Sequence, residues 1–187
     1  MDEALWALGR GTGVVALVCF TLTMVLGIMG CGGRNALGVG RFGLNELHRT
    51  AALTGVGLIA VHVGSLMFDP YAQLSVVDAV VPFLGDYRPL WQGLGTLAVD
   101  LLLVVTVVSL LRDRVGPRVF RAVHLLTYLM WPVALAHAVG NGTDNTSAWM
   151  IGLAAGCVLA VALAVGWRLS PAFVGRGRVR VERRLGT

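Results

Sequence analysis

Apolar residues fill five long stretches of the chain, and polar residues gather in the segments between them. A helix of about 20 apolar residues crosses the hydrocarbon core of a bilayer. A helix also satisfies its own backbone polar groups, which lipid cannot do. The sequence therefore predicts an all-α membrane protein, a bundle of five transmembrane helices at about residues 11–30, 45–68, 90–111, 119–139 and 148–167.

The composition agrees with a chain surrounded by lipid. Hydrophobic residues make up 56% of the 187 residues and charged residues only 13%, whereas soluble domains carry about 25% charged residues. All fifteen basic residues are arginine. Basic cytoplasmic loops of a membrane protein account for this charge, so we expect a lipid bilayer as partner and no nucleic acid.

The arginines fall on one side of the predicted membrane. They lie between spans one and two, between spans three and four, and after span five. Because cytoplasmic loops are enriched in arginine, we expect the N-terminus outside and the C-terminus in the cytoplasm. The start Met1-Asp2-Glu3 is acidic and no A-x-A cleavage site directly follows the first span, so we expect that span to be retained. Residues 1–167 then form the membrane domain and residues 168–187 a basic cytoplasmic tail.

Four histidines, all that the chain has, lie in two of the spans. His48 and His62 are in span two, and His124 and His137 are in span four. One span separates these two, so they run parallel. The fourteen- and thirteen-residue spacings correspond to rises of roughly 21 Å and 19.5 Å. A histidine inside a membrane is costly and usually functional.

Each helix thus offers one imidazole at each of two depths, which is the geometry of two bis-histidine haems. We expect two b-type haems, one on the cytoplasmic side between His48 and His124 and one on the outer side between His62 and His137. The four histidines are also the predicted metal ligands. A zinc site is disfavoured, because its ligands must converge on one centre and each pair is separated by most of a membrane.

Helical phase tests this arrangement. At about 100° per residue, His62 lies within roughly 40° of His48 around the helix, but His137 lies roughly 140° from His124. Proline breaks or kinks a helix, so the sequence predicts an irregular span four near Trp131-Pro132.

Three further residues are candidates for binding the cofactor. Trp131 follows His124 by seven residues, and Gly55 follows His48 by seven, so Trp131 opposite Gly55 would lie between the haems; ordinary packing is the alternative. Arg49 and Arg121 flank the cytoplasmic pair and either bind haem propionates or mark the membrane boundary.

Asp100, inside span three, is expected to form a hydrogen bond with Thr96 or Thr54, or to carry protons.

The chain resembles the ferric-reductase-like transmembrane domain family. The shared feature is two histidines, thirteen or fourteen residues apart, on each of two parallel helices with one span between them. The match covers about residues 11–167, and the stretches Leu47-His48-Arg49-Thr50 and Asp69 to Trp91 look like bacterial members. The resemblance implies the same two haems, an aromatic residue between them at Trp131, and a multi-pass protein of the bacterial cell membrane.

The chain departs from the family pattern in two ways. Family members usually have six spans, and many carry an FAD/NADPH domain after the last one, where only the short tail follows here. We therefore expect an electron-transport subunit of an oxidoreductase that takes electrons from a separate cytoplasmic flavoprotein or ferredoxin-like donor. The acceptor at the outer face would be ferric iron, oxygen or a partner oxidoreductase.

Three other functions remain open from the sequence. The chain could be the haem-containing membrane anchor of a quinone-linked enzyme, or a non-enzymatic haem-binding module. It could also be a small transporter that uses Asp100 and the histidines as a proton relay.

Overall fold

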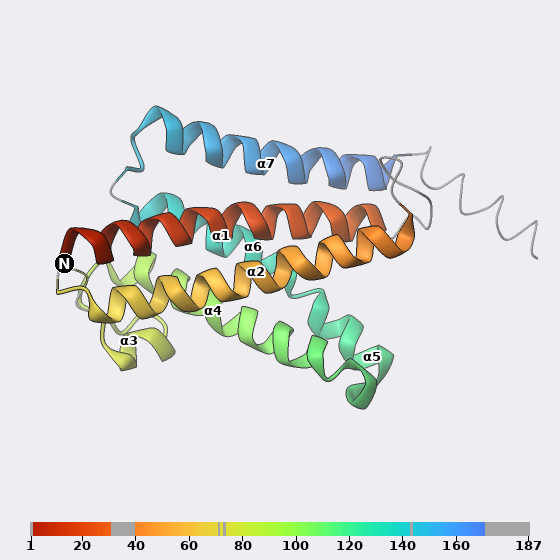
Figure 1. The fold of residues 1–187 in the computed structure, drawn as a ribbon, viewed down its shortest axis with the longest axis horizontal. Helices are drawn as coiled ribbons and strands as arrows, with labels where there is room; N and C mark the ends of the chain where they lie inside the picture. Colours follow the sequence, from red (N-terminus) through yellow and green to blue (C-terminus); the bar gives the residue numbers. More distant parts are fainter. Residues whose placement is uncertain (1, 31–39, 71, 73, 143, 171–187) are drawn as a thin grey trace, which may run out of the picture.

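A computed structural model of the chain describes residues 2–30, 40–70, 72, 74–142 and 144–170 (Figure 1). The topology prediction also used Arg34 and the arginines within residues 171–187, and these lie outside the described residues. The all-α fold is confirmed: across the described residues the regular elements are α1 (Asp2–Gly30), α2 (Arg41–Phe68), α3 (Val76–Val80), α4 (Pro89–Leu110), α5 (Arg112–His124), α6 (Thr127–Asn141) and α7 (Ala148–Leu169).

The helices are those of a multi-pass membrane protein. Among the described residues α1, α2, α4 and α7 are each long and apolar enough to cross a bilayer, and α5 with α6 makes a fifth if the bent pair counts as one span. Large apolar side chains such as Leu103 and Leu163 are more than 60% exposed. So much exposed apolar surface along the sides of the bundle fits lipid contact.

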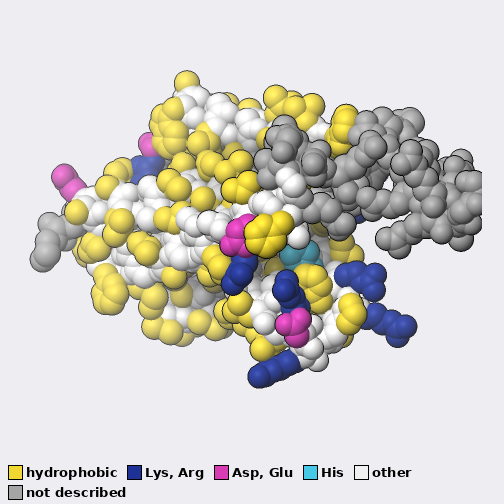
Figure 2. All heavy atoms as spheres, turned by 45° about the vertical axis from the view of Figure 1, so that its right-hand side comes forward, with side chains coloured by type: hydrophobic (Ala, Val, Ile, Leu, Met, Phe, Trp, Pro, Cys, Tyr) yellow, Lys and Arg dark blue, Asp and Glu magenta, His cyan; other side chains and the backbone are white. Residues whose placement is uncertain are grey.

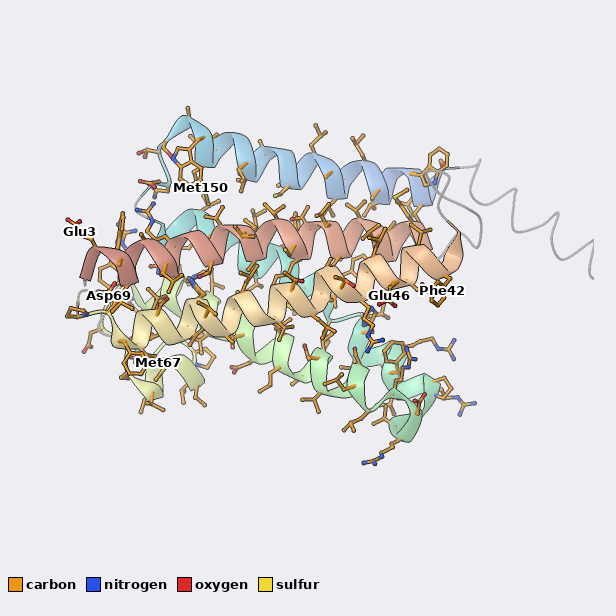
Figure 3. All side chains as sticks on the ribbon, viewed as in Figure 1. Glu3, Phe42, Glu46, Met67, Asp69 and Met150 are labelled. Carbon is orange, nitrogen blue, oxygen red and sulfur yellow. The ribbon has the colours of Figure 1, made fainter. Side chains whose placement is uncertain are left out.

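The centre of the bundle is α1. It forms an antiparallel pair with α2, so that Glu3 and Asp69 lie at one end and Phe42 and Glu46 at the other (Figure 3). It also packs against α6 and α7, while α4 packs along α6. The buried core follows this arrangement, with residues from α1, α6 and α7: Ala16, Leu17, Phe20, Met24, Ile28, Met130, Trp131, Cys157 and Ala164.

The two ends of the bundle differ in charge. Exposed arginines gather at the end formed by the start of α2 and by α5, which we call the arginine-rich end (Figure 2). These arginines are Arg49, Arg112, Arg114, Arg118 and Arg121. The opposite end, called the α3 end, carries α3 and the start of α1. There Thr96 donates a hydrogen bond of 2.7 Å to the carbonyl of Asp78 and so ties α4 to α3.

The fourth span is irregular, as predicted, but the break is not near Trp131-Pro132. It lies at Leu125 and Leu126, where α5 and α6 meet at 48°. The N–H groups of Leu126 and Tyr128 donate to carbonyls three residues back, at 2.9 and 3.1 Å. Such a turn is wound more tightly than an α-helix.

The proline explains why the break comes earlier than expected. Pro132 lies inside α6, and a proline ring clashes with the carbonyl four residues before it. That carbonyl belongs to Tyr128, so the disturbance falls on the turn that precedes the proline. A second break follows from Gly116, whose φ of 80° lies in the left-handed region that favours glycine. Pro117 then restarts the helix that carries His124.

Candidate functional site

The structure brings the four histidines together in two pairs. His48 of α2 lies beside His124 at the end of α5, with ring centres 6.1 Å apart and planes tilted by 58°. His62 of α2 lies beside His137 of α6, with ring centres 6.4 Å apart and planes at 81°. Among the described helices, α2 makes an extended contact only with α1. The two pairs therefore lie across a gap between α2 and the bent span.

The separation in each pair fits two imidazoles that bind one metal ion from opposite sides. An imidazole nitrogen binds a metal at about 2.0–2.1 Å, so two such rings have their centres roughly 6.3 Å apart. In the described part of the chain, no three His, Cys, Asp or Glu side chains are grouped so that they could hold a metal ion. Each pair therefore suits a metal whose other ligands come from a cofactor, as in a haem.

Three of the four imidazoles are fixed by a backbone carbonyl. His48 Nδ1 lies 2.9 Å from the carbonyl oxygen of Thr23, and His62 Nδ1 lies 2.6 Å from that of Gly9. His137 Nδ1 lies 2.8 Å from the carbonyl oxygen of Trp91. A carbonyl can only accept, so each Nδ1 carries the proton and each Nε2 keeps its lone pair for a metal.

A glycine makes each of these carbonyls accessible. Gly13, Gly27 and Gly95 each follow the accepting residue by four positions, on the same helix face. A Cβ on Gly13 would lie 2.9 Å from the His62 ring, and one on Gly95 would lie 2.5 Å from the His137 ring. A Cβ on Gly27 would lie 3.2 Å from the His48 ring. Each imidazole passes over the glycine to reach the carbonyl, so a side chain in place of the glycine would displace the imidazole.

His124 is held differently. Its Nδ1 is buried and has no hydrogen-bond partner among the described residues. The ring stacks on Phe120, one turn earlier on α5, with centres 5.2 Å apart and planes at 24°. The positions of α4 that lie thirteen and fourteen residues beyond Gly95 are Val108 and Ser109. Neither is a glycine, so the arrangement around His137 is not repeated at His124.

Two aromatic side chains, Trp131 of α6 and Phe20 of α1, are buried in the core of the bundle. Trp131 is buried and its indole donates a 3.0 Å hydrogen bond to Thr21 of α1. The side chain that packs over Gly55 is Phe20, which a Cβ there would approach to 2.8 Å. The side chain nearest to Gly55 therefore comes from α1, whose rotation the helical phase of α2 and α6 does not reveal.

A cavity of about 390 Å³ opens at the α3 end and is lined by both His62 and His137. Trp6, Arg10 and Asp144 also line it. Arg10 forms an ion pair with Asp144 and lies 4.2 Å from the ring centre of Trp6. The sequence does not single out Arg10 or Asp144, because neither lies in a motif.

Among the described residues, Arg49, Arg121 and Asp100 form no hydrogen bond with a histidine side chain. Arg49 and Arg121 are exposed at the arginine-rich end, and Arg121 donates a 3.0 Å bond to the Pro117 carbonyl. Asp100 has no hydrogen bond or ion pair within the described ranges, and Thr96 bonds to Asp78 instead. The expected bond from Asp100 to Thr96 is therefore wrong.

Comparison with known proteins shows the family of the chain. Neither the curated proteins nor the solved structures provide a match to the chain. The family model for the ferric reductase like transmembrane component matches residues 12–135. The matched region is about two thirds of the chain, includes His48, His62 and His124, and stops just before His137. The chain belongs to the ferric-reductase-like transmembrane family.

Proposed function

We propose that this protein carries electrons across a membrane through two b-type haems. His48 and His124 would hold one haem and His62 and His137 the other. The observation that carries the proposal is the repeated pairing of imidazoles at 6.1 and 6.4 Å, on helices where their sequence separation spans most of a bilayer. When bound, the haems supply one-electron redox chemistry.

The chain's own residues fix the position of each ligand and exclude solvent. The carbonyls of Thr23, Gly9 and Trp91 orient three imidazoles with Nε2 available. Phe20 and Trp131 are buried in the core of the bundle, and they would keep water from the path between the two pairs. Trp131 is our candidate for shortening the electron path, because it lies along the fourth span between His124 and His137.

We place the arginine-rich end in the cytoplasm, with the α3 end outside, because cytoplasmic segments are enriched in arginine. Electrons would enter through the pair His48 and His124 and leave through the pair His62 and His137. Arg49 and Arg121 remain candidates for binding the propionates of the inner haem. The outer acceptor would be ferric iron, oxygen or a partner oxidoreductase.

The electron donor would be a cytoplasmic flavoprotein or ferredoxin-like protein with an acidic surface. Figure 2 shows a histidine side chain at the surface close to arginine side chains of the arginine-rich end. Opposite charge on the donor would speed its docking at this place. The donor would then be held close to the inner pair.

Electron transfer in proteoliposomes tests the function. The purified chain is inserted into vesicles that contain ferricyanide, and dithionite is added outside. We expect ferricyanide reduction that is fast compared with empty vesicles. The variant with both His62→Ala and His137→Ala should insert normally but lose this activity. Equal rates for the double variant and the unchanged chain would contradict the proposal.

A further inference from the structure

Three of the four imidazoles are fixed by a backbone carbonyl, and the fourth, His124, is not. We infer that His124 is an exchangeable ligand, so that the inner haem binds a small exogenous molecule such as carbon monoxide more tightly than the outer haem does. This inference rests on the proposed function, because it concerns how firmly each histidine holds its haem.

The outer pair is held on both sides. To leave a metal, His62 would have to rotate away and give up its 2.6 Å bond to Gly9, and His137 its 2.8 Å bond to Trp91. The two rings also lie directly against Gly13 and Gly95. An imidazole that is bonded at Nδ1 and packed against a helix has a preferred orientation before it binds, so it rebinds faster than a small competitor can enter.

His124 lacks this restraint. Rotation of its ring breaks no hydrogen bond within the described structure, because Nδ1 has no partner there. Its contact with Phe120 is a stacking contact between two residues of the same helix turn, and such a contact can be kept as the ring shifts. His124 is also the last residue of α5, directly before the break at Leu125 and Leu126.

The exchange itself requires no electron transfer. Carbon monoxide would replace the His124 imidazole as a neutral donor of one electron pair, and the Nε2 lone pair would return to the imidazole ring. The remaining ligand is His48, which keeps its bond to the Thr23 carbonyl. A difference of one hydrogen bond corresponds to about a tenfold difference in ligand exchange.

Two double variants separate the sites. The variant with His62→Ala and His137→Ala keeps only the inner pair, and the variant with His48→Ala and His124→Ala keeps only the outer pair. Each is purified, reduced with dithionite and titrated with carbon monoxide while the Soret band is followed. We expect the inner-only protein to bind carbon monoxide at least about tenfold more tightly than the outer-only protein.

A third arm tests the restraint at the outer site. In the outer-only protein, Gly95→Ala should displace His137 and lower the haem content per chain. The haem that remains, held by His62 alone, should bind carbon monoxide. Gly64→Ala, on a helix position with no neighbour within 4 Å, is the matched control and should leave binding unchanged.

The outcomes are distinguishable. Equal carbon monoxide binding by the two double variants, or tighter binding by the outer-only protein, would overturn the inference and leave the proposed function standing. A chain that binds no haem would overturn both. If Gly95→Ala does not fold, the comparison of the two double variants decides alone.

Discussion

His137 and Trp91 are joined by a hydrogen bond of 2.8 Å from the imidazole Nδ1 to the backbone carbonyl oxygen. The bond joins α6 to the first turn of α4, and it exists only because Gly95 leaves the carbonyl open. The same arrangement joins His62 to Gly9 and His48 to Thr23 on α1. The carbonyls that orient these three histidines thus belong to α1 and α4, the helices that contribute no histidine to the site.

Replacement of the glycines should affect the two haems unequally. A Cβ on Gly13 would approach the His62 ring to 2.9 Å, whereas one on Gly27 would stay 3.2 Å from the His48 ring. We expect Gly13→Ala to lose most of the outer haem and Gly27→Ala to keep most of the inner one. Haem per chain, measured by pyridine haemochrome, checks this. Gly57→Ala, which has open space around it, is the control, and equal losses in all three variants would contradict the account.

Single histidine replacements should remove one haem each. We expect His62→Ala to lower the content from two haems per chain to about one. Loss of an outer-shell partner already lowers the affinity for a metal roughly 10- to 100-fold, and loss of a ligand should lower the affinity for that haem by at least as much. His48→Ala should lose the other haem, and the two variants should differ in which reduction potential survives. The same surviving potential in both variants would contradict the pairing.

The hydrogen bond from Trp131 to Thr21 should contribute measurably to stability. Trp131→Phe keeps the aromatic ring but loses the bond, which is expected to cost about 1 kcal/mol. Trp131→Ala removes a buried side chain from the core and should cost about 3–5 kcal/mol. Thermal unfolding in detergent measures both changes.

Trp149 offers the control for this prediction. It is 52% exposed, so Trp149→Phe should change the unfolding temperature little. If Trp149→Phe lowers the unfolding temperature as much as Trp131→Phe does, the hydrogen bond of Trp131 makes no specific contribution to stability.

Neutralising the arginine-rich end should slow reduction by an anionic donor. Arg112, Arg114 and Arg118 are exposed there, and opposite charges raise association rates that fall again with salt. We expect the triple replacement by Gln to slow reduction by a reduced anthraquinone disulfonate several-fold at low salt and little at high salt. Arg88→Gln, at the α3 end, is the control. A rate independent of these arginines would contradict donor docking at this end.

The sequence predicts the helices and the histidine pairs well, for a physical reason. Lipid requires apolar stretches of a fixed length, and histidine in such a stretch is rare enough to be informative. The spans predicted for α2, α4 and α7 end within a few residues of the observed helices. His48 and His124 lie side by side, as do His62 and His137.

Features that depend on packing between helices could not be predicted in the same way. The break at Leu125 and Leu126 depends on how the chain accommodates Pro132 in three dimensions. The contact of Gly55 with Phe20 depends on the rotation of α1. The hydrogen bonds from the histidines to backbone carbonyls require no particular side chain on the accepting residue, so the residue types do not reveal the acceptors.

One signal in the sequence could have revealed the role of α1. Gly13 and Gly27 are fourteen residues apart, the same spacing as His48 and His62. When two helices pair in antiparallel fashion, residues with the same spacing on each helix can meet at two places. The glycine pair on α1 therefore indicates that α1 is the helix against which His48 and His62 pack.

The most direct test of the central claim is the absorption spectrum of the purified chain, oxidised and then reduced with dithionite, with haem quantified per chain. The account predicts a b-type spectrum and two haems per chain, since two imidazole pairs are present. A chain that folds and inserts into membranes but shows no Soret band would contradict it.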